Sequence, residues 1–394
     1  MTERYQIPLN VDELMAKARE ITGVDIIDTE VVEPLTILLN SLNTESRLHK
    51  TGAIAKQNKI LRLLANRLRM KRDYAAHPEI ADEKIEAPIF IFGMARSGTT
   101  KTHRVLAASG DFNYMPFWMV QYPSLFTGDK NESPQARIDA ADEYCRWLDD
   151  TAPESKLGHS FETLEAEEDS LLTEQCFIAP SFLGYAEVPS YMAWMGEQGM
   201  VPVFNMLKDT LKYLQWQGLA TGEKPWLLKA PSYYGFEPAL LSVFPDARIA
   251  MTHRSPLSTV PSLCKLVNQF HIPFDSARVN GPSLEKDLAG VMQLHMDNRK
   301  SVAGLRFLDI LFEDVVNDMD YVAQQFYDFV GMELSEQSLN NIHNWNTGNP
   351  IHKKGKFVYS LEEFELTEEL IKQDFAEYFA LIDGLKEVQR ARLG

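Results

Sequence analysis

The sequence predicts an α/β protein in which a central parallel sheet is flanked by helices. Apolar, strand-like stretches occur at 87–92, 226–252 and 305–311, and helix-prone sequence follows each of them. Strands that alternate with helices are typical of a parallel sheet, which binds its ligand beyond the carboxyl ends of the strands. We expect this α/β domain to cover residues 86–394.

The N-terminal region, residues 1–85, is expected to be a helical extension. Val11, Leu14 and Ala18 recur at helical spacing, and apolar residues between 54 and 68 do so again. We expect these helices to pack on the α/β domain or to build a homodimer.

The first strand-like stretch leads into a loop that is bracketed by glycines. Within APIFIFGMARSGTT (87–100), Gly93 and Gly98 have the spacing of a nucleotide triphosphatase phosphate loop, but Thr99 occupies the lysine position. A cationic residue occurs earlier instead, at Arg96. Glycines allow the backbone to approach an anion closely, and the N-terminus of the following helix attracts that anion. The strand, loop and helix are therefore expected to form a P-loop-like unit of the sheet. The residues expected to bind phosphate are Gly93, Arg96, Ser97, Gly98, Thr99 and Thr100.

Two further strands are predicted to end in basic residues. Arg254 follows one strand, and Ser255-Pro256 is typical of an N-cap and first helical position, which leaves Ser262 on the next helix. An arginine fork and a hydroxyl suit a dianionic phosphate. Lys229 ends the strand at LLKAP and is expected to steer anionic groups, or else to reach solvent.

Together these motifs resemble the sulfotransferases that use 3′-phosphoadenosine 5′-phosphosulfate (PAPS). The first loop is similar to the family's P-[KR]-S-G-T-T, with Ala95 in place of the proline, and LLKAP is similar to the LLKSP of a bacterial branch. The resemblance, which spans roughly residues 88–375, implies that Arg254 and Ser262 bind the 3′-phosphate of the donor. HKKGK at 352–356 resembles the family's R-K-G loop. It implies that the 3′-phosphate is also clamped by Lys353, Lys354 and Gly355.

The segment LEAEEDSLLTEQCFI (164–178) contains the predicted general base. We expect a helix here, with Glu168 on the same stripe as Leu171 and Gln175. A carboxylate on an apolar stripe is costly unless it has a partner or a task. The segment resembles P-E-E-D-E of the same bacterial branch. It departs from that motif at Ala166 and Ser170 and matches it at Glu167, Glu168 and Asp169.

The resemblance implies in-line transfer of a sulfuryl group from PAPS to an acceptor hydroxyl, which leaves 3′,5′-bisphosphoadenosine. Glu168 is expected to take the acceptor proton, with Glu167 or His159 as alternatives, while Arg96 and Lys229 stabilise developing charge. This mechanism requires no metal. A kinase or triphosphatase in which Thr100 and Asp309 hold Mg²⁺ remains an alternative, as does a noncatalytic nucleotide-binding protein.

The insertion at about 111–225 is rich in aromatic residues and methionine. Phe117, Trp118, Met119, Tyr122, Trp194 and Met195 are expected to form packed core or, alternatively, an apolar pocket for a hydrophobic small-molecule or lipid acceptor.

Composition excludes several classes of protein. A net charge of −17 and a sequence pI near 5.0 disfavour nucleic-acid binding. The three cysteines, Cys145, Cys176 and Cys264, lack metal-ligand or redox spacing and are expected to be buried thiols. The acidic N-terminus and the absence of a long apolar stretch predict a cytoplasmic protein without a transmembrane segment.

Overall fold

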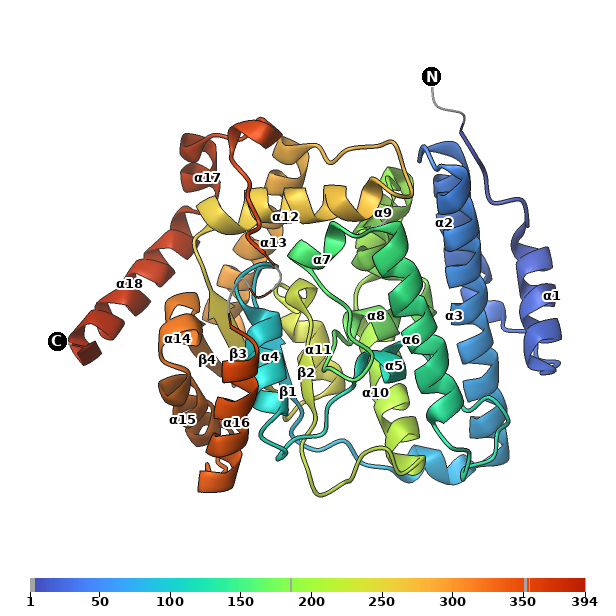
Figure 1. The fold of residues 1–394 in the computed structure, drawn as a ribbon, viewed down its shortest axis with the longest axis horizontal. Coiled ribbons are helices and arrows are strands. Elements are labelled where there is room, and N and C mark those ends of the chain that lie inside the picture. Colours follow the sequence, from blue (N-terminus) through green and yellow to red (C-terminus); the bar gives the residue numbers. More distant parts are fainter. Residues whose placement is uncertain (1–3, 185, 351–352, 354, 394) are drawn as a thin grey trace. The chain divides into compact units, whose positions relative to one another are not determined.

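The computed structural model describes residues 4–184, 186–350, 353 and 355–393. The chain, drawn from end to end in Figure 1, divides into two compact units. Unit 1 comprises Met1–Ile85, Met115–Gly222 and Val267–Arg278, and unit 2 comprises Glu86–Tyr114, Glu223–Leu266 and Val279–Gly394.

Unit 2 contains the predicted parallel sheet. Its strands are β1 (Ile89–Phe92), β2 (Leu227–Lys229), β3 (Arg248–His253) and β4 (Phe307–Leu311), in the order β2-β1-β3-β4. All three neighbouring pairs are parallel. The four residues of β1 are fully buried, as expected for a central strand that is covered on both faces.

Helices separate these strands along the chain, as the sequence predicts. The helices of unit 2 are α4 (Thr99–Ala107), α11 (Glu237–Val243), most of α12 (Pro256–His271), α13 (Gly281–Ser301), α14 (Phe312–Asn317), α15 (Met319–Val330), α16 (Glu336–Gly348), α17 (Glu368–Asp374) and α18 (Ala376–Leu393). The helix-prone sequence that follows the stretch 305–311 is divided between α14 and α15. Asp318 interrupts it, because its side chain accepts a hydrogen bond from the Tyr321 amide at 3.3 Å and caps α15.

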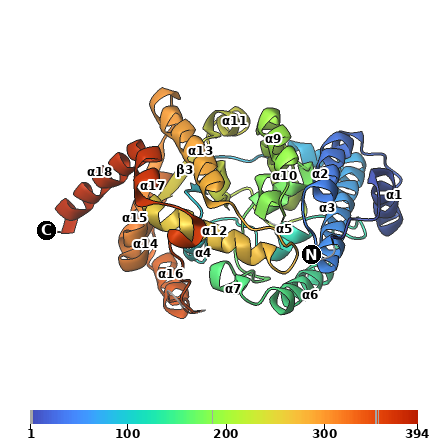
Figure 2. The same cartoon turned by 90° about the horizontal axis from the view of Figure 1, so that it is seen from above.

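Unit 1 is helical, which confirms the helices predicted for the N-terminal region. Its helices are α1 (Val11–Thr22), α2 (Val32–Thr44), α3 (Lys50–Ala76), α5 (Phe117–Gln121), α6 (Gln135–Thr151), α7 (Ser155–Gly158), α8 (Ser170–Thr173), α9 (Pro189–Gln198) and α10 (Val201–Trp216). The first three lie side by side in both views (Figures 1 and 2). Asn10 and Glu13 form a capping box that fixes the start of α1.

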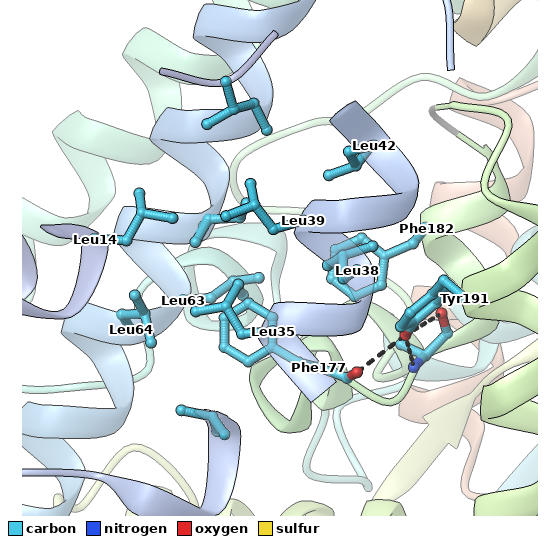
Figure 3. Close-up of a cluster of buried hydrophobic side chains, with 14 of the residues drawn as sticks. Leu14, Leu35, Leu38, Leu39, Leu42, Leu63, Leu64, Phe177, Phe182 and Tyr191 are labelled. Carbon is cyan, nitrogen blue, oxygen red and sulfur yellow. Dashed lines mark hydrogen bonds between the residues drawn. The ribbon is translucent and has the colours of Figure 1, made fainter. Parts of the chain in front are cut away.

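The core of unit 1 joins the N-terminal helices to the insertion. Leucines of α1, α2 and α3 pack with Phe177, Phe182 and Tyr191 from the 177–191 segment (Figure 3). The buried Tyr191 hydroxyl donates to the Phe177 carbonyl at 3.1 Å and accepts from the Ala179 amide at 2.9 Å. The N-terminal region and the insertion therefore share one hydrophobic core. Within the described ranges, no helix is both long enough and apolar enough to cross a bilayer.

Candidate active-site residues

The loop between β1 and α4 has a geometry that requires glycine. Gly93 has φ 141°, and a Cβ there would lie 2.5 Å from the Thr252 hydroxyl oxygen and 2.6 Å from the Thr252 carbonyl. Gly98 has φ 97° immediately before α4, and Arg96 has φ 78°. These are conformations that L side chains rarely adopt. The chain therefore turns tightly onto the helix N-terminus.

Ser97 braces this loop from within. Its hydroxyl lies 2.7 Å from that of the β3 residue Thr252, which itself donates to the Phe92 carbonyl at 3.3 Å. The Ser97 amide donates to the Met94 carbonyl at 3.0 Å. These bonds direct the Ser97 donors into the loop. The groups of this turn that could bind an anion are the first-turn amides of α4 and the hydroxyls of Thr99 and Thr100.

Arg96, Arg254 and Ser262 lie together at the carboxyl end of the sheet. The Arg96 Nε donates to the Ser262 hydroxyl at 3.1 Å, and the Arg254 Nη1 donates to the Arg96 carbonyl at 2.9 Å. Burial and the charge of Arg254 lower the pKa of Arg96 to about 10. Two close guanidinium groups repel each other, and an anion between or beside them would relieve that repulsion.

Lys229 reaches the same helix terminus from the neighbouring strand β2. Its side chain is fully buried, and its Nζ donates to the Thr100 hydroxyl at 3.3 Å. The strand-end lysine thus points to the glycine loop and the start of α4 rather than to solvent.

The C-terminal basic segment is described in part. Lys354 lies outside the described residues, whereas Lys353 is exposed and donates to the Asn349 side chain at 3.0 Å. Gly355 has φ 114°. Two residues further along the chain, the ring of Phe357 lies 5.0 Å from the Arg96 guanidinium, so this segment passes close to the loop.

Asp309, the carboxylate that a Mg²⁺ site would need, is hydrogen-bonded to a histidine and an arginine. Its Oδ1 accepts from His253 at 2.9 Å, and Arg299 donates to both carboxylate oxygens at 2.8 and 2.7 Å. Burial alone would raise the pKa of Asp309, but these hydrogen bonds outweigh it and hold the pKa below its usual value. Asp309 therefore links the strand β4 to β3 and α13 through its hydrogen bonds.

The candidate bases lie in unit 1. Glu167 is fully buried, and its carboxylate oxygens are 3.2 and 3.1 Å from the His159 Nε2. The Glu168 amide donates to Glu167 at 2.9 Å, and the Glu168 carboxylate accepts from the Ser170 hydroxyl at 3.2 Å. Glu168 and His159 are half-buried. One ligand atom from each of the three residues lies within 4.8 Å of the others, so the group combines two carboxylates and an imidazole.

The continuous helix predicted for 164–178 is wrong. Only Ser170–Thr173 forms an α-helix, followed by a 3-10 turn at Glu174–Cys176. Before it, Phe117 donates its amide to the Glu165 carbonyl at 3.0 Å, and Glu167 donates to the Met115 carbonyl at 2.9 Å. These bonds between segments replace helical ones. Glu167, Asp169 and Glu174 are buried in this segment, whereas Glu168 is half-buried.

The aromatic residues of the insertion are mainly buried. Phe117, Trp118 and Met119 are at most 7% exposed, and Trp194 and Met195 pack against the core that contains Tyr191. This burial favours the packed-core interpretation for these five. The predicted burial of the thiols is confirmed at Cys145, Cys176 and Cys264.

Sequence reasoning missed three residues around the loop. Thr252 precedes the basic end of β3 and braces Ser97, and its place on a strand next to the loop was an available signal. Phe312 and Phe357, which contact the two arginines, carry no sequence signal that separates them from core aromatics.

Comparison with known proteins bears on the family and the fold of the chain. A family model described as "Sulfotransferase family" matches residues 88–336. Sulfotransferase STF1 from Mycobacterium tuberculosis is 25% identical, with 95% of this chain and 100% of that chain covered and a TM-score of 0.79. Sulfotransferase STF9 from Mycobacterium avium has the same fold at 23% identity, with coverage of 96% and 98% and a TM-score of 0.83. No curated protein matches the chain.

Proposed function

The chain belongs to the sulfotransferase family, and we propose that it transfers a sulfuryl group from PAPS to a hydroxyl of a hydrophobic small molecule or lipid. The observation that carries the choice of donor is the convergence of Arg96, Arg254 and Ser262 on the glycine loop of unit 2. PAPS carries phosphate at both its 5′ and 3′ positions, and this set offers cationic forks and amides for both.

The loop and α4 are proposed to bind the 5′-phosphosulfate. Gly93 packs so closely on Thr252 and Ser97 that a Cβ has no space there, and this packing holds the loop in the shape that leads onto the α4 N-terminus. Arg254 and Ser262 are proposed to bind the 3′-phosphate, together with Lys353, Lys354 and Gly355. Arginine suits this task because its planar fork bonds two phosphate oxygens at once.

In the proposed reaction the acceptor oxygen attacks the sulfur atom. The new sulfur–oxygen bond forms as the bond to the phosphate oxygen breaks, which yields a sulfate ester and 3′,5′-bisphosphoadenosine. Arg96, Lys229 and the α4 amides stabilise negative charge on the sulfuryl group and on the departing phosphate. Positioning and electrostatic stabilisation are the main sources of rate in related phosphoryl transfers.

Glu168 is the proposed acceptor of the hydroxyl proton. Its carboxylate is half-buried, whereas Glu167 is fully buried and bonds to His159 and the Glu168 amide. Glu167 is therefore better suited to orient its neighbours than to touch substrate. His159 is the alternative base, because its ring is also half-buried.

Calorimetric titration tests the donor assignment directly. The purified protein is titrated with 3′,5′-bisphosphoadenosine and separately with ATP, each with Mg²⁺ and with a chelator. We expect bisphosphate binding that is independent of Mg²⁺ and tighter than ATP binding. Mg²⁺-dependent ATP binding without preference for the bisphosphate would overturn the donor assignment, and bisphosphate binding without turnover of any acceptor would favour a noncatalytic nucleotide-binding protein.

A further inference from the structure

Phe312 lies against the arginine assigned to the 3′-phosphate. It is the first residue of α14, directly after β4, and its side chain is half-buried. The guanidinium carbon of Arg254 lies 4.2 Å from the centre of its ring. At this distance the aromatic ring attracts the cation and restricts the orientations of a long, flexible side chain.

The same ring also contacts the phosphate loop. A Cβ on Gly98 would lie 2.9 Å from the Phe312 Cδ2, so the ring packs directly on the last glycine before α4. Arg254 in turn donates to the Arg96 carbonyl at 2.9 Å. Phe312, Arg254 and the loop are therefore one connected set of contacts within unit 2.

The acidic residues next to Phe312 have partners on α18. Glu313 lies 3.7 Å from Lys386, and Asp314 accepts from Arg392 and from Gln389. These partners compensate the carboxylates at the start of α14. Phe312 contacts Arg254 through its ring. Because a ring carries no negative charge, it does not neutralise the guanidinium, which can still pair with an anion.

We propose that Phe312 is a positioning residue that determines donor specificity: by stacking on Arg254, it fixes the guanidinium for a nucleotide that carries a 3′-phosphate. The proposal rests on the proposed function, because it takes the 3′-phosphate role of Arg254 as given. A stacked guanidinium keeps its N–H edges available for phosphate oxygens. It also loses less conformational entropy on binding than a mobile side chain would.

The test compares two nucleotides on three proteins. Dissociation constants for 3′,5′-bisphosphoadenosine and for adenosine 5′-phosphate are measured by calorimetry on the wild type, Phe312→Leu and Phe312→Tyr. Leucine keeps an apolar contact with Gly98 but removes the aromatic face, whereas tyrosine keeps both. We expect Phe312→Leu to lower the preference for the bisphosphate about tenfold, or about 1.4 kcal/mol, with adenosine 5′-phosphate affinity unchanged. Phe312→Tyr should retain the wild-type preference.

Each other result has a defined meaning. An unchanged preference in Phe312→Leu would overturn the proposal, and so would equal weakening of both nucleotides, which would show that the ring supports the loop and not Arg254. Lack of preference in the wild type itself would instead refute the 3′-phosphate site, and with it the PAPS assignment. Retained binding of adenosine 5′-phosphate shows that the variant is folded.

Discussion

At the scale of single residues, Arg96 combines an unusual backbone conformation with a buried charge. It has a left-handed backbone at φ 78°, and burial together with the charge of Arg254 lowers its pKa to about 10. Non-glycine residues in sparsely populated conformations cost about 1–3 kcal/mol and persist where the surrounding structure enforces them. The Arg254 hydrogen bond to the Arg96 carbonyl supplies part of that enforcement.

Removing either arginine should weaken donor binding. We expect Arg96→Ala and Arg254→Ala each to raise the dissociation constant of 3′,5′-bisphosphoadenosine about 10- to 100-fold, since hydrogen bonds to charged groups are worth about 1.5–3 kcal/mol. Calorimetry with the bisphosphate measures this change. Arg390→Ala, at an exposed position on α18, is the matched control and should bind normally. Wild-type affinity in Arg254→Ala would remove its 3′-phosphate role.

Replacing the proposed base should separate binding from chemistry. Glu168→Gln keeps the shape of the side chain but cannot take a proton, so the turnover rate should fall about 10²- to 10⁴-fold while bisphosphate affinity is retained. Steady-state sulfation assays and calorimetry on the same preparation provide both quantities. Intact transfer in Glu168→Gln, combined with loss of transfer in His159→Gln, would identify His159 as the base.

At the scale of elements, the connection from β1 to α4 depends on backbone shape. Gly93→Ala places a Cβ 2.5 Å from Thr252 at a φ of 141°, so we expect loss of bisphosphate binding and destabilisation by at least about 2 kcal/mol. Denaturant unfolding with calorimetry measures both effects. Gly290→Ala is the control, because this α13 glycine has no neighbour within 4 Å of a new Cβ. It should stabilise the protein by about 0.5–1 kcal/mol. Unimpaired binding in Gly93→Ala would contradict the cradle geometry.

Much of unit 2 could be predicted from local sequence because its signals are local. Apolar strands, the glycine spacing and the Pro256 helix start each depend on neighbouring residues, and all three occur as expected. The segment 164–178 could not be predicted, because its backbone bonds to the distant residues Met115 and Phe117 override the helical period. Phe312 was beyond reach for the same reason, since its partners are remote in sequence.

At the scale of the whole molecule, buried ionisable groups link stability to pH. His253 is fully buried. Its Nε2 donates to Asp309 at 2.9 Å, and its Nδ1 lies 3.2 Å from the Tyr378 hydroxyl. The pKa of His253 is below its usual value, chiefly because of burial. As the pH falls, His253 therefore binds a proton at a higher pH in the unfolded chain than in the folded chain. Its contribution to stability is complete above about pH 6.5 and is lost as the pH falls below that value.

Replacing this histidine should flatten the acid limb of the stability curve. We expect His253→Gln to lose less unfolding free energy below about pH 6.5 than the wild type does. The difference in slope should be at most about 1.4 kcal/mol per pH unit. Urea unfolding between pH 7 and pH 5 measures the slope. Equal slopes in the wild type and His253→Gln would contradict the assignment.

The shared core of unit 1 has a consequence for biosynthesis. Leu14 and Leu38 leave the ribosome well before Phe177 and Tyr191, with which they are finally packed. At roughly 5–20 residues per second, the nascent N-terminal helices must wait about 7 to 35 seconds for the rest of their core. During that interval their apolar faces are exposed, so ribosome-associated chaperones should engage the emerging chain before residue 191 is translated.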